Sequence, residues 1–283
     1  MYKFENTILI VVFNYSDSVC NKNAIKNIYE RYFKKIIFYS DYPIIQDDDD
    51  DDDDVNFIHI NKGCNAHKVF NHFYKKYKSI IDDSDGLFYT MDDNIINVNI
   101  LNLFDSEKII YYYNNNKNEN MDVILSGNTT YKSWFKLDYI NNHKHWHWDT
   151  YKNSIQNLIN DSEFKTYNIN KFSASFSDWF YLPKKYLTHK LFDLFELFSN
   201  YEVFLEIAIS TIIHNIENDE NQYQQFTNNI LWNDRENLLN KEYIYNSLNC
   251  EHNLIIHPIK FNQNPNSKEW LIDIFCKDKC VII

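Results

Sequence analysis

The 283-residue sequence predicts a single α/β domain with a mostly parallel, Rossmann-like sheet flanked by helices. Short apolar runs typical of strands buried on both faces alternate with helical patterns, and no internal repeat or Gly/Ser linker divides the chain. Hydrophobic residues make up 44% of the chain, enough for a sizeable core. We expect one domain over residues 1–283, with 47–54 an acidic low-complexity loop and 262–283 a C-terminal tail.

The first half of the chain carries the clearest strand and helix patterns. Strands alternating with helices imply parallel pairing, with ligands at the carboxyl ends of the strands. The expected strands are residues 7–13, 35–40, 55–60 and 86–91, and the expected helices are residues 23–33 and 66–79.

The second half has weaker strand patterns and stronger helical ones. The helical pattern of residues 202–216 is apolar nearly all round, so we expect a buried helix with Glu206 in its middle. The other expected elements are strands near 109–113, 176–182 and 250–261, and helices over 148–159 and 186–198.

Composition excludes several functional classes. The eight aspartates of the run 47–54 account for eight of the twelve net negative charges. Because no basic stripe is present, we expect no nucleic-acid partner. The three glycines, Gly63, Gly86 and Gly127, are isolated, which excludes a P-loop or a dinucleotide fingerprint.

The cysteines and the length of the apolar runs indicate in which cellular compartment the protein resides. The five cysteines show no metal-site spacing and indicate reduced thiols in a cytoplasmic protein. The apolar run 7–13 is too short for a membrane span, and no cleavage site follows it, so we expect neither a transmembrane segment nor a signal peptide. The ending Cys280-Val-Ile-Ile has the prenylation pattern, which would make Cys280 a lipidation site and give peripheral membrane contact; chance is the alternative.

Asp92, Asp93 and Asn94, which we call the acidic turn, directly follow the strand 86–91. Carboxylates at such a strand end suit Mg²⁺ or Mn²⁺, which take one or two protein ligands and fill the rest of their shell from phosphate and water. The alternative is a solvated turn, because these residues also favour turns. Two other strand ends, at Asn14 and at Ser40 and Asp41, should converge on the same crevice.

Side chains in the second half are candidates for the acceptor side and the diphosphate. Glu206 lies in an apolar stretch, so it is paired with a cation, protonated or functional, and Asp178 is a second acid candidate. His257 would be a late ligand of the same ion and Lys260 a phosphate partner, although a single loop histidine is usually unremarkable.

The tract 143–149 alternates His with Lys or Trp. If it is extended, Trp146 and Trp148 share one face and form a platform for a sugar ring, with plain packing as the alternative. A three-His zinc site is disfavoured, because histidines at this spacing on a strand rarely converge on one ion.

Taken in order, six motifs resemble the plant STELLO-type glycosyltransferase domain, which is similar to exostosin-like glycosyltransferases of the GT-A fold. Each motif is degenerate alone, but their order and spacing over residues 8–260 are fairly specific. The motifs are TILIVVFNY, IIFYSDYP, DGLFYTMDDNIINV, FSDWFYLPKKY, VFLEIAI and IIHPIKF.

The resemblance implies transfer of a sugar from a nucleotide-diphosphate donor to a glycan, protein or lipid hydroxyl, with Mn²⁺ or Mg²⁺. It implies a metal bound by Asp93, Asn94 and His257. It also implies that Asn14 and the Asp41 region contact the nucleotide and that the acidic turn, through Asp92, contacts the ribose. Glu206 would lie near the acceptor. Asn94 departs from the Asp often found in these folds, so the alternative is a catalytically inactive binding or scaffold protein. The relatives carry a secretory anchor that is missing here, so action in the cytosol is expected.

Overall fold

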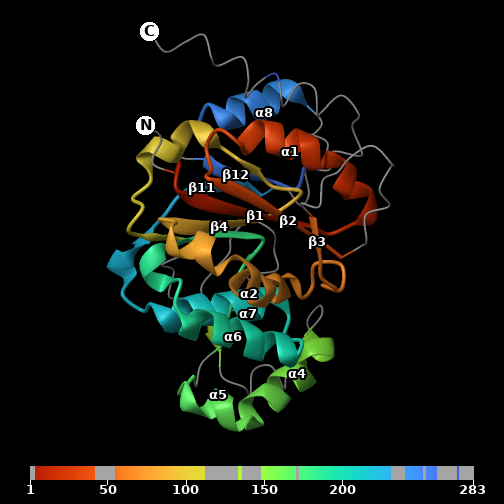
Figure 1. Cartoon of the computed structure of the whole chain (residues 1–283), viewed down its shortest axis with the longest axis vertical. Helices are drawn as coiled ribbons and strands as arrows, with labels where there is room; N and C mark the ends of the chain where they lie inside the picture. The colour runs from red at the N-terminus through yellow and green to blue at the C-terminus, as the bar shows by residue number, and fades with distance from the viewer. Residues whose placement is uncertain are drawn as a thin grey trace.

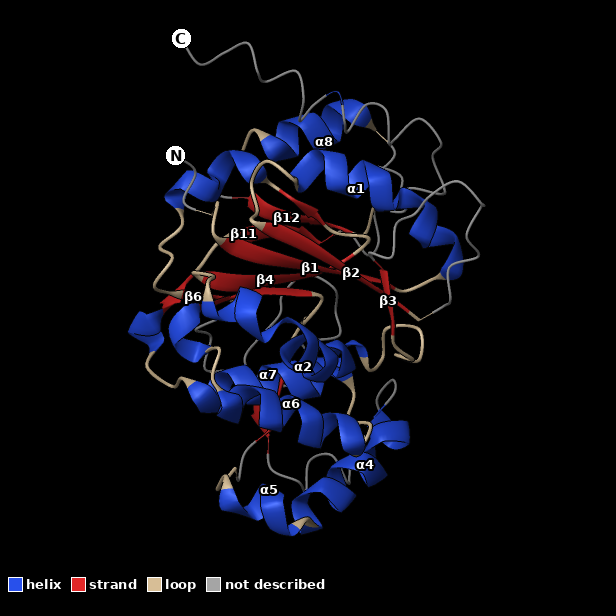
Figure 2. Cartoon of the chain, viewed as in Figure 1, coloured by secondary structure: helices blue, strands red, loops and turns tan. Residues whose placement is uncertain are grey.

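The computed structural model describes residues 4–41, 55–111, 133–135, 148–169, 172–230, 240–250, 253–259 and 273. A central sheet lies between two layers of helices, with α4 and α5 at the far end of one layer (Figures 1 and 2). This arrangement confirms the predicted α/β class with a mostly parallel sheet.

The main sheet has seven strands in the order β10-β6-β9-β4-β1-β2-β3. β1, β2, β3 and β4 pair in parallel, as the alternating pattern predicts. β9 enters antiparallel between β4 and β6. The strands are β1 Thr7–Phe13, β2 Lys35–Ser40, β3 Val55–Phe57, β4 Gly86–Met91, β6 Ile109–Ile110, β9 Trp179–Pro183 and β10 Tyr223–Gln224.

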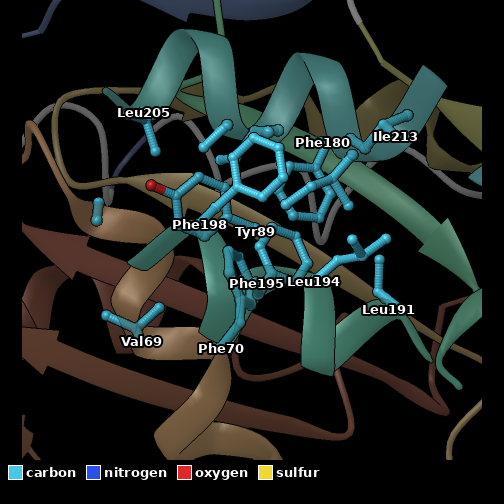
Figure 3. Packing of buried hydrophobic residues seen from close by; sticks show 14 of the residues in the cluster. Val69, Phe70, Tyr89, Phe180, Leu191, Leu194, Phe195, Phe198, Leu205 and Ile213 are labelled. Atoms are coloured by element: carbon cyan, nitrogen blue, oxygen red, sulfur yellow. The ribbon is translucent and has the colours of Figure 1, made fainter. Parts of the chain in front are cut away.

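Both faces of the main sheet are buried, because successive side chains of a strand point to opposite faces. Along β1, Ile8 and Ile10 join one hydrophobic core, and Leu9 and Val11 join the other. The first core packs the sheet against α2, α6 and α7, and Phe70 from α2 meets Phe195 from α6 with ring centroids 4.4 Å apart (Figure 3). The second core packs the sheet against α1 and α8.

Each of the five predicted helices is present with shifted ends, whereas the helices Ser162–Thr166 and Lys241–Leu248 were not predicted. The helix expected over 186–198 begins later, because the Thr188 side chain accepts from the Leu191 N–H and caps it. The α-helices are α1 Lys22–Tyr29, α2 Val69–Asp82, α4 Trp148–Asn160, α5 Ser162–Thr166, α6 His189–Asn200, α7 Leu205–Ile216 and α8 Lys241–Leu248. The short 3₁₀ turns are η1 Ser16–Asn21, η2 Ala66–Lys68, η3 Val98–Leu103, η5 Lys184–Tyr186 and η6 Glu220–Gln222.

Two small sheets complete the structure. One has the order β11-β12-β5, with β11 Thr227–Ile230, β12 Asn253–His257 and β5 Ile95–Ile96. The other pairs β7 Ser133–Phe135 with β8 Phe172–Ala174. Within the described ranges, no helix is long and apolar enough to cross a membrane.

Candidate functional site

Asn14 and Asp92 lie at the carboxyl ends of β1 and β4, where the order of the main sheet reverses. β2 and β3 extend from one side of β1, whereas β4 lies on its other side. Ligands of doubly wound sheets bind at such a switch point. The Asn14 backbone N–H donates to Asp92 Oδ1 at 3.2 Å, and the Asp92 N–H donates to the Val12 carbonyl at 2.9 Å.

β9 brings Asp178 to the same place. Its first residue, Trp179, pairs with Thr90, so Asp178 stands beside the end of β4. The Asp178 carbonyl accepts from the Met91 N–H at 2.9 Å, and its carboxylate side chain is 19% exposed. A carboxylate from the second half of the chain therefore joins the acidic turn.

β12 brings His257 to the turn through the small sheet. β5 directly follows Asn94, and the antiparallel register pairs Ile95 with Ile256. The next residues on each strand, Asn94 and His257, are consequently neighbours, and Asn94 Oδ1 lies 2.8 Å from His257 Nδ1. The Ile259 N–H donates to the Asp93 carbonyl at 2.6 Å and ties the two segments together.

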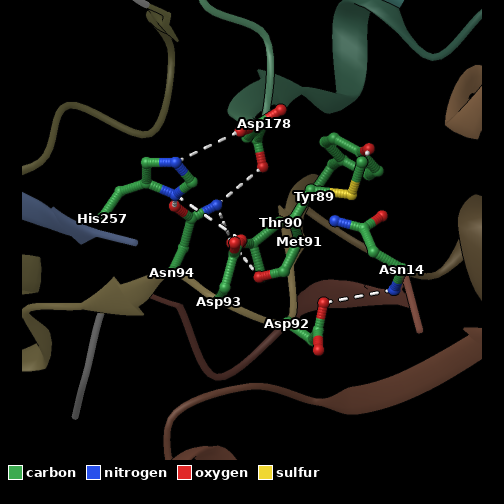
Figure 4. A network of polar contacts seen from close by, with 9 residues as sticks. All are labelled: Asn14, Tyr89, Thr90, Met91, Asp92, Asp93, Asn94, Asp178 and His257. Carbon is green, nitrogen blue, oxygen red and sulfur yellow. Dashed lines mark hydrogen bonds and ion pairs between the residues drawn. The ribbon is translucent and has the colours of Figure 1, made fainter. Parts of the chain in front are cut away.

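Figure 4 shows the His257 ring beside Asp93, which follows β4, and Asp178, which precedes β9. Nδ1 lies 3.5 Å from Asp93 Oδ1, and Nε2 lies 3.7 Å from Asp178 Oδ2. The ring is 2% exposed, and the Phe176 ring packs against it at 5.0 Å between centroids. The structure therefore assembles the acidic turn, Asp178 and His257 into one buried cluster.

The cluster also affects the pKa of Tyr89, which lies on β4 just before the acidic turn. Burial raises the pKa of the Tyr89 hydroxyl well above its ordinary value, and the carboxylates of Asp178, Asp93 and Asp92 raise it further. Tyr89 therefore stays neutral, and its hydroxyl donates to Met91 Sδ at 3.2 Å.

Asn94 uses its side-chain amide within the protein. Nδ2 donates to Thr90 Oγ1 at 3.2 Å and to the Asp178 carbonyl at 3.0 Å, while Oδ1 faces His257. The metal-binding role that the sequence suggests for Asn94 gains no support from this orientation. The amide instead connects β4, β9 and β12.

Asp41 supports a loop beside the crevice. Oδ1 accepts from the Ile60 N–H and His59 Nδ1, each at 2.8 Å, and Oδ2 accepts from the Lys62 N–H at 2.6 Å. The Asp41 carboxylate is thus engaged by the loop 59–62, although the sequence suggests a donor-binding group. Ser40, the last residue of β2, is buried, and its carbonyl accepts from the Ile58 N–H.

Gly63 is a site residue that the sequence did not assign. Its φ is +86°, and a Cβ there would lie 2.3 Å from Asn14 Oδ1. Asn14 Oδ1 is itself buried, and no donor among the described residues reaches it. The scarcity of glycine in the chain was the signal that could have singled out Gly63.

Glu206 lies in the first turn of α7, and the expectation of a place in the middle of a helix was wrong. Glu202 has a φ of +52°, and Phe204 is extended, so the helix starts at Leu205. Burial raises the pKa of the Glu206 carboxyl to about 8. Burial raises the pKa of the nearby Tyr111 hydroxyl, to which Glu206 adds a smaller increase, and this hydroxyl lies 2.7 Å from Ser177 Oγ, next to Asp178.

Several predicted residues cannot be placed. Lys260, Trp146 and Cys280, like the acidic run 47–54, lie outside the described residues. Trp148 is the first residue of α4, which is helical and not extended there, and its side chain lies outside the described part.

No group of three or more His, Cys, Asp or Glu side chains in the described part of the chain could hold a metal ion. Two adjacent carboxylates nevertheless suit a hard ion that brings phosphate and water as its other ligands. The donor set at Asp92 and Asp93 thus fits an ion that arrives with a diphosphate better than a resident one.

The chain matches no model of a known protein family, and no curated protein matches it. The resemblance of its motifs to STELLO-type glycosyltransferases therefore stays a prediction.

Proposed function

We propose that the chain is a glycosyltransferase that moves a sugar from a nucleotide-diphosphate donor to a hydroxyl of a glycan, protein or lipid, with Mn²⁺ or Mg²⁺. The observation that supports this most is the position of Asp92 and Asp93 at the switch point of the sheet, beside Asn14. Ligand chemistry at a doubly wound sheet concentrates there, and both carboxylates are nearly buried.

The donor would lie along the carboxyl ends of β1 and β4. Asn14 Oδ1 is a buried acceptor that no described donor reaches, and an N–H or O–H of the nucleoside would satisfy it. Gly63 leaves the space for this amide, because any Cβ would collide with it.

Asp93 and Asp92 are the residues that would hold the divalent ion. When bound, such an ion neutralises the charge that develops on the leaving diphosphate. We do not assign the ion to Asn94, whose amide bonds within the protein, or to His257 Nδ1, which faces Asn94.

Asp178 and Glu206 would serve the acceptor side. Asp178 is the more exposed carboxylate of the cluster and lies near the ion site, so it suits a hydroxyl that must lose a proton. With a pKa of about 8, Glu206 holds a proton at neutral pH and would act as a hydrogen-bond donor. The segment 175–178 joins the two, since the Ser175 N–H donates to the Glu206 carbonyl at 3.3 Å.

The test is hydrolysis or transfer of nucleotide sugars with Mn²⁺, screened across donors. Asp93→Asn should lower activity by more than about tenfold. Loss of even an outer-shell partner of a metal commonly lowers activity by about tenfold or more, and Asp93 is proposed as a direct ligand. Asp85→Asn is the matched control, because Asp85 precedes the same strand at its other end, is exposed and, among the described residues, forms hydrogen bonds only through its backbone. Equal activity of Asp93→Asn and Asp85→Asn would refute the role of Asp93.

A second candidate is a binding or scaffold protein without catalysis. The internal hydrogen bonds of the Asn94 amide favour it, because a ligand position often filled by Asp in these folds then contributes no charge. Binding of a nucleotide diphosphate without turnover of any donor sugar would favour this candidate.

A further inference from the structure

The loop that contains Gly63 also reaches the start of α7. Gly63 faces Asn14, and the carbonyl of the next residue, Cys64, accepts from the Leu205 N–H at 2.8 Å. Leu205 is the first residue of α7, and Glu206 follows it directly. One short loop therefore contacts both the proposed donor position and the helix that carries Glu206.

α7 receives a cap from this loop. The N–H groups of the first turn of a helix have no partner inside the helix, and a polar side chain at the N-cap position often supplies one. The N-cap residue of α7 is Phe204, whose apolar side chain cannot accept a hydrogen bond. The Cys64 carbonyl accepts from the Leu205 N–H in its place.

Asn65 holds the segment that leads into α7. It occupies the N-cap position of η2, where an Asn side chain usually accepts from an N–H of its own turn. The described η2 receives no such bond, and Asn65 Nδ2 instead donates to the Val203 carbonyl at 3.2 Å. Both residues are buried, so the carbonyl would lose this donor at a place that water does not reach.

We propose that Asn65 is a positioning residue that, together with the Cys64 carbonyl, anchors the first turn of α7 and so holds the Glu206 carboxyl at the acceptor side of the site. The acceptor side rests on the proposed function; the anchoring does not. Helix ends fray most readily, and Glu206 lies in such an end. The Ser175 N–H donates to the Glu206 carbonyl at 3.3 Å, so the turn is held from a second side as well.

The anchoring is measured by ¹³C NMR of the carboxyl groups against pH, on the full chain with ¹³C-labelled glutamate. The Glu206 signal is assigned by its loss in Glu206→Gln. Burial raises the pKa of the Glu206 carboxyl to about 8, and a frayed first turn admits water. In Asn65→Ala the titration midpoint should therefore fall by more than about one pH unit. An unchanged midpoint overturns the role of Asn65.

Asn56→Ala is the matched control for the loss of a buried amide. Asn56 lies on β3, is also buried, and donates through Nδ2 to a backbone carbonyl, that of Phe38, at 3.1 Å. The Glu206 midpoint should stay at the wild-type value in this variant. A fall as large as in Asn65→Ala would mean that general loss of stability moves the midpoint, and it would overturn the positioning role.

Leu205→Pro and Leu205→Ala test the anchor without changing Asn65. Proline lacks the N–H that bonds to the Cys64 carbonyl, yet it is tolerated at the first position of a helix, and the extended Phe204 suits a following proline. Both variants lose the buried Leu205 side chain, but only Ala keeps the N–H. The midpoint should fall further with Pro than with Ala, and equal midpoints overturn the part of Cys64. Circular dichroism confirms folding, and if the Pro variant does not fold, Asn65→Ala decides.

Catalysis gives a second readout, with Mn²⁺ and the nucleotide sugar that the donor screen identifies, beginning with uridine diphosphate glucose. Asn65→Ala should lower kcat about tenfold or more with little change in the donor KM, because Asn14 is untouched. In the Glu206→Gln background it should have almost no further effect, since a positioning residue acts through the group that it places. An equal loss in both backgrounds overturns the proposal. If the wild type turns over no nucleotide sugar, the proposed function fails, while the titration still decides the anchoring.

Discussion

Replacing Asp41 with Ala should destabilise the protein through the loop beside the crevice. Asp41 is 6% exposed and accepts the backbone N–H groups of Ile60 and Lys62. A hydrogen bond to a charged group contributes about 1.5–3 kcal/mol, so two give about 3–6 kcal/mol. Lys62 lies at the surface, where water replaces part of its bond, and we therefore expect a loss near the lower end, about 3 kcal/mol.

Urea unfolding followed by circular dichroism measures this loss as a lower midpoint at an unchanged slope. His59→Ala is the control, because the His59 side chain is 74% exposed and its ion pair with Asp41 should contribute less than about 1 kcal/mol. If Asp41→Ala loses no more stability than His59→Ala, the support of the loop by Asp41 is refuted.

Two further predictions concern Gly63 and Glu206. Gly63→Ala should lower stability by about 1–2 kcal/mol from the left-handed backbone alone and weaken nucleotide binding by displacing Asn14, as thermal melting and calorimetry will measure. Between pH 4.5 and about 8 folded Glu206 keeps a proton that the unfolded chain releases, so its contribution lowers stability as pH rises, by up to about 1.4 kcal/mol per pH unit. Glu206→Gln should lack this fall in urea midpoints across that range; the same fall in the variant would contradict the raised pKa.

The main sheet could be predicted from the sequence because its strands carry local signals. β1 is apolar at every position but Thr7, and its polar end at Asn14 marks the edge where ligands bind. The acidic turn after β4 was predicted on the same grounds, and the structure places both strand ends side by side.

The contact between Asn94 and His257 was not foreseen, because it depends on the pairing of β5 with β12, some 160 positions apart. β5 has only two residues, too few for any periodicity. The sequence suggested His257 as a metal ligand, whereas the register of this small sheet turns its Nδ1 toward an amide.

The structural role of Asp41 was also hidden in the sequence. A carboxylate at a strand end has the same appearance whether it binds a ligand or its own backbone. Only the left-handed conformation of Asn61, Lys62 and Gly63 folds the loop back so that its N–H groups reach Asp41.

Calorimetric titration with uridine and guanosine diphosphates, with and without Mn²⁺, tests the central claim most directly. We predict that the protein binds at least one of them in the presence of Mn²⁺ and that Asp93→Asn loses this binding while Asp85→Asn keeps it. Failure to bind either diphosphate, or binding that is equally strong without Mn²⁺ and in Asp93→Asn, would contradict a metal-dependent diphosphate site between β1 and β4.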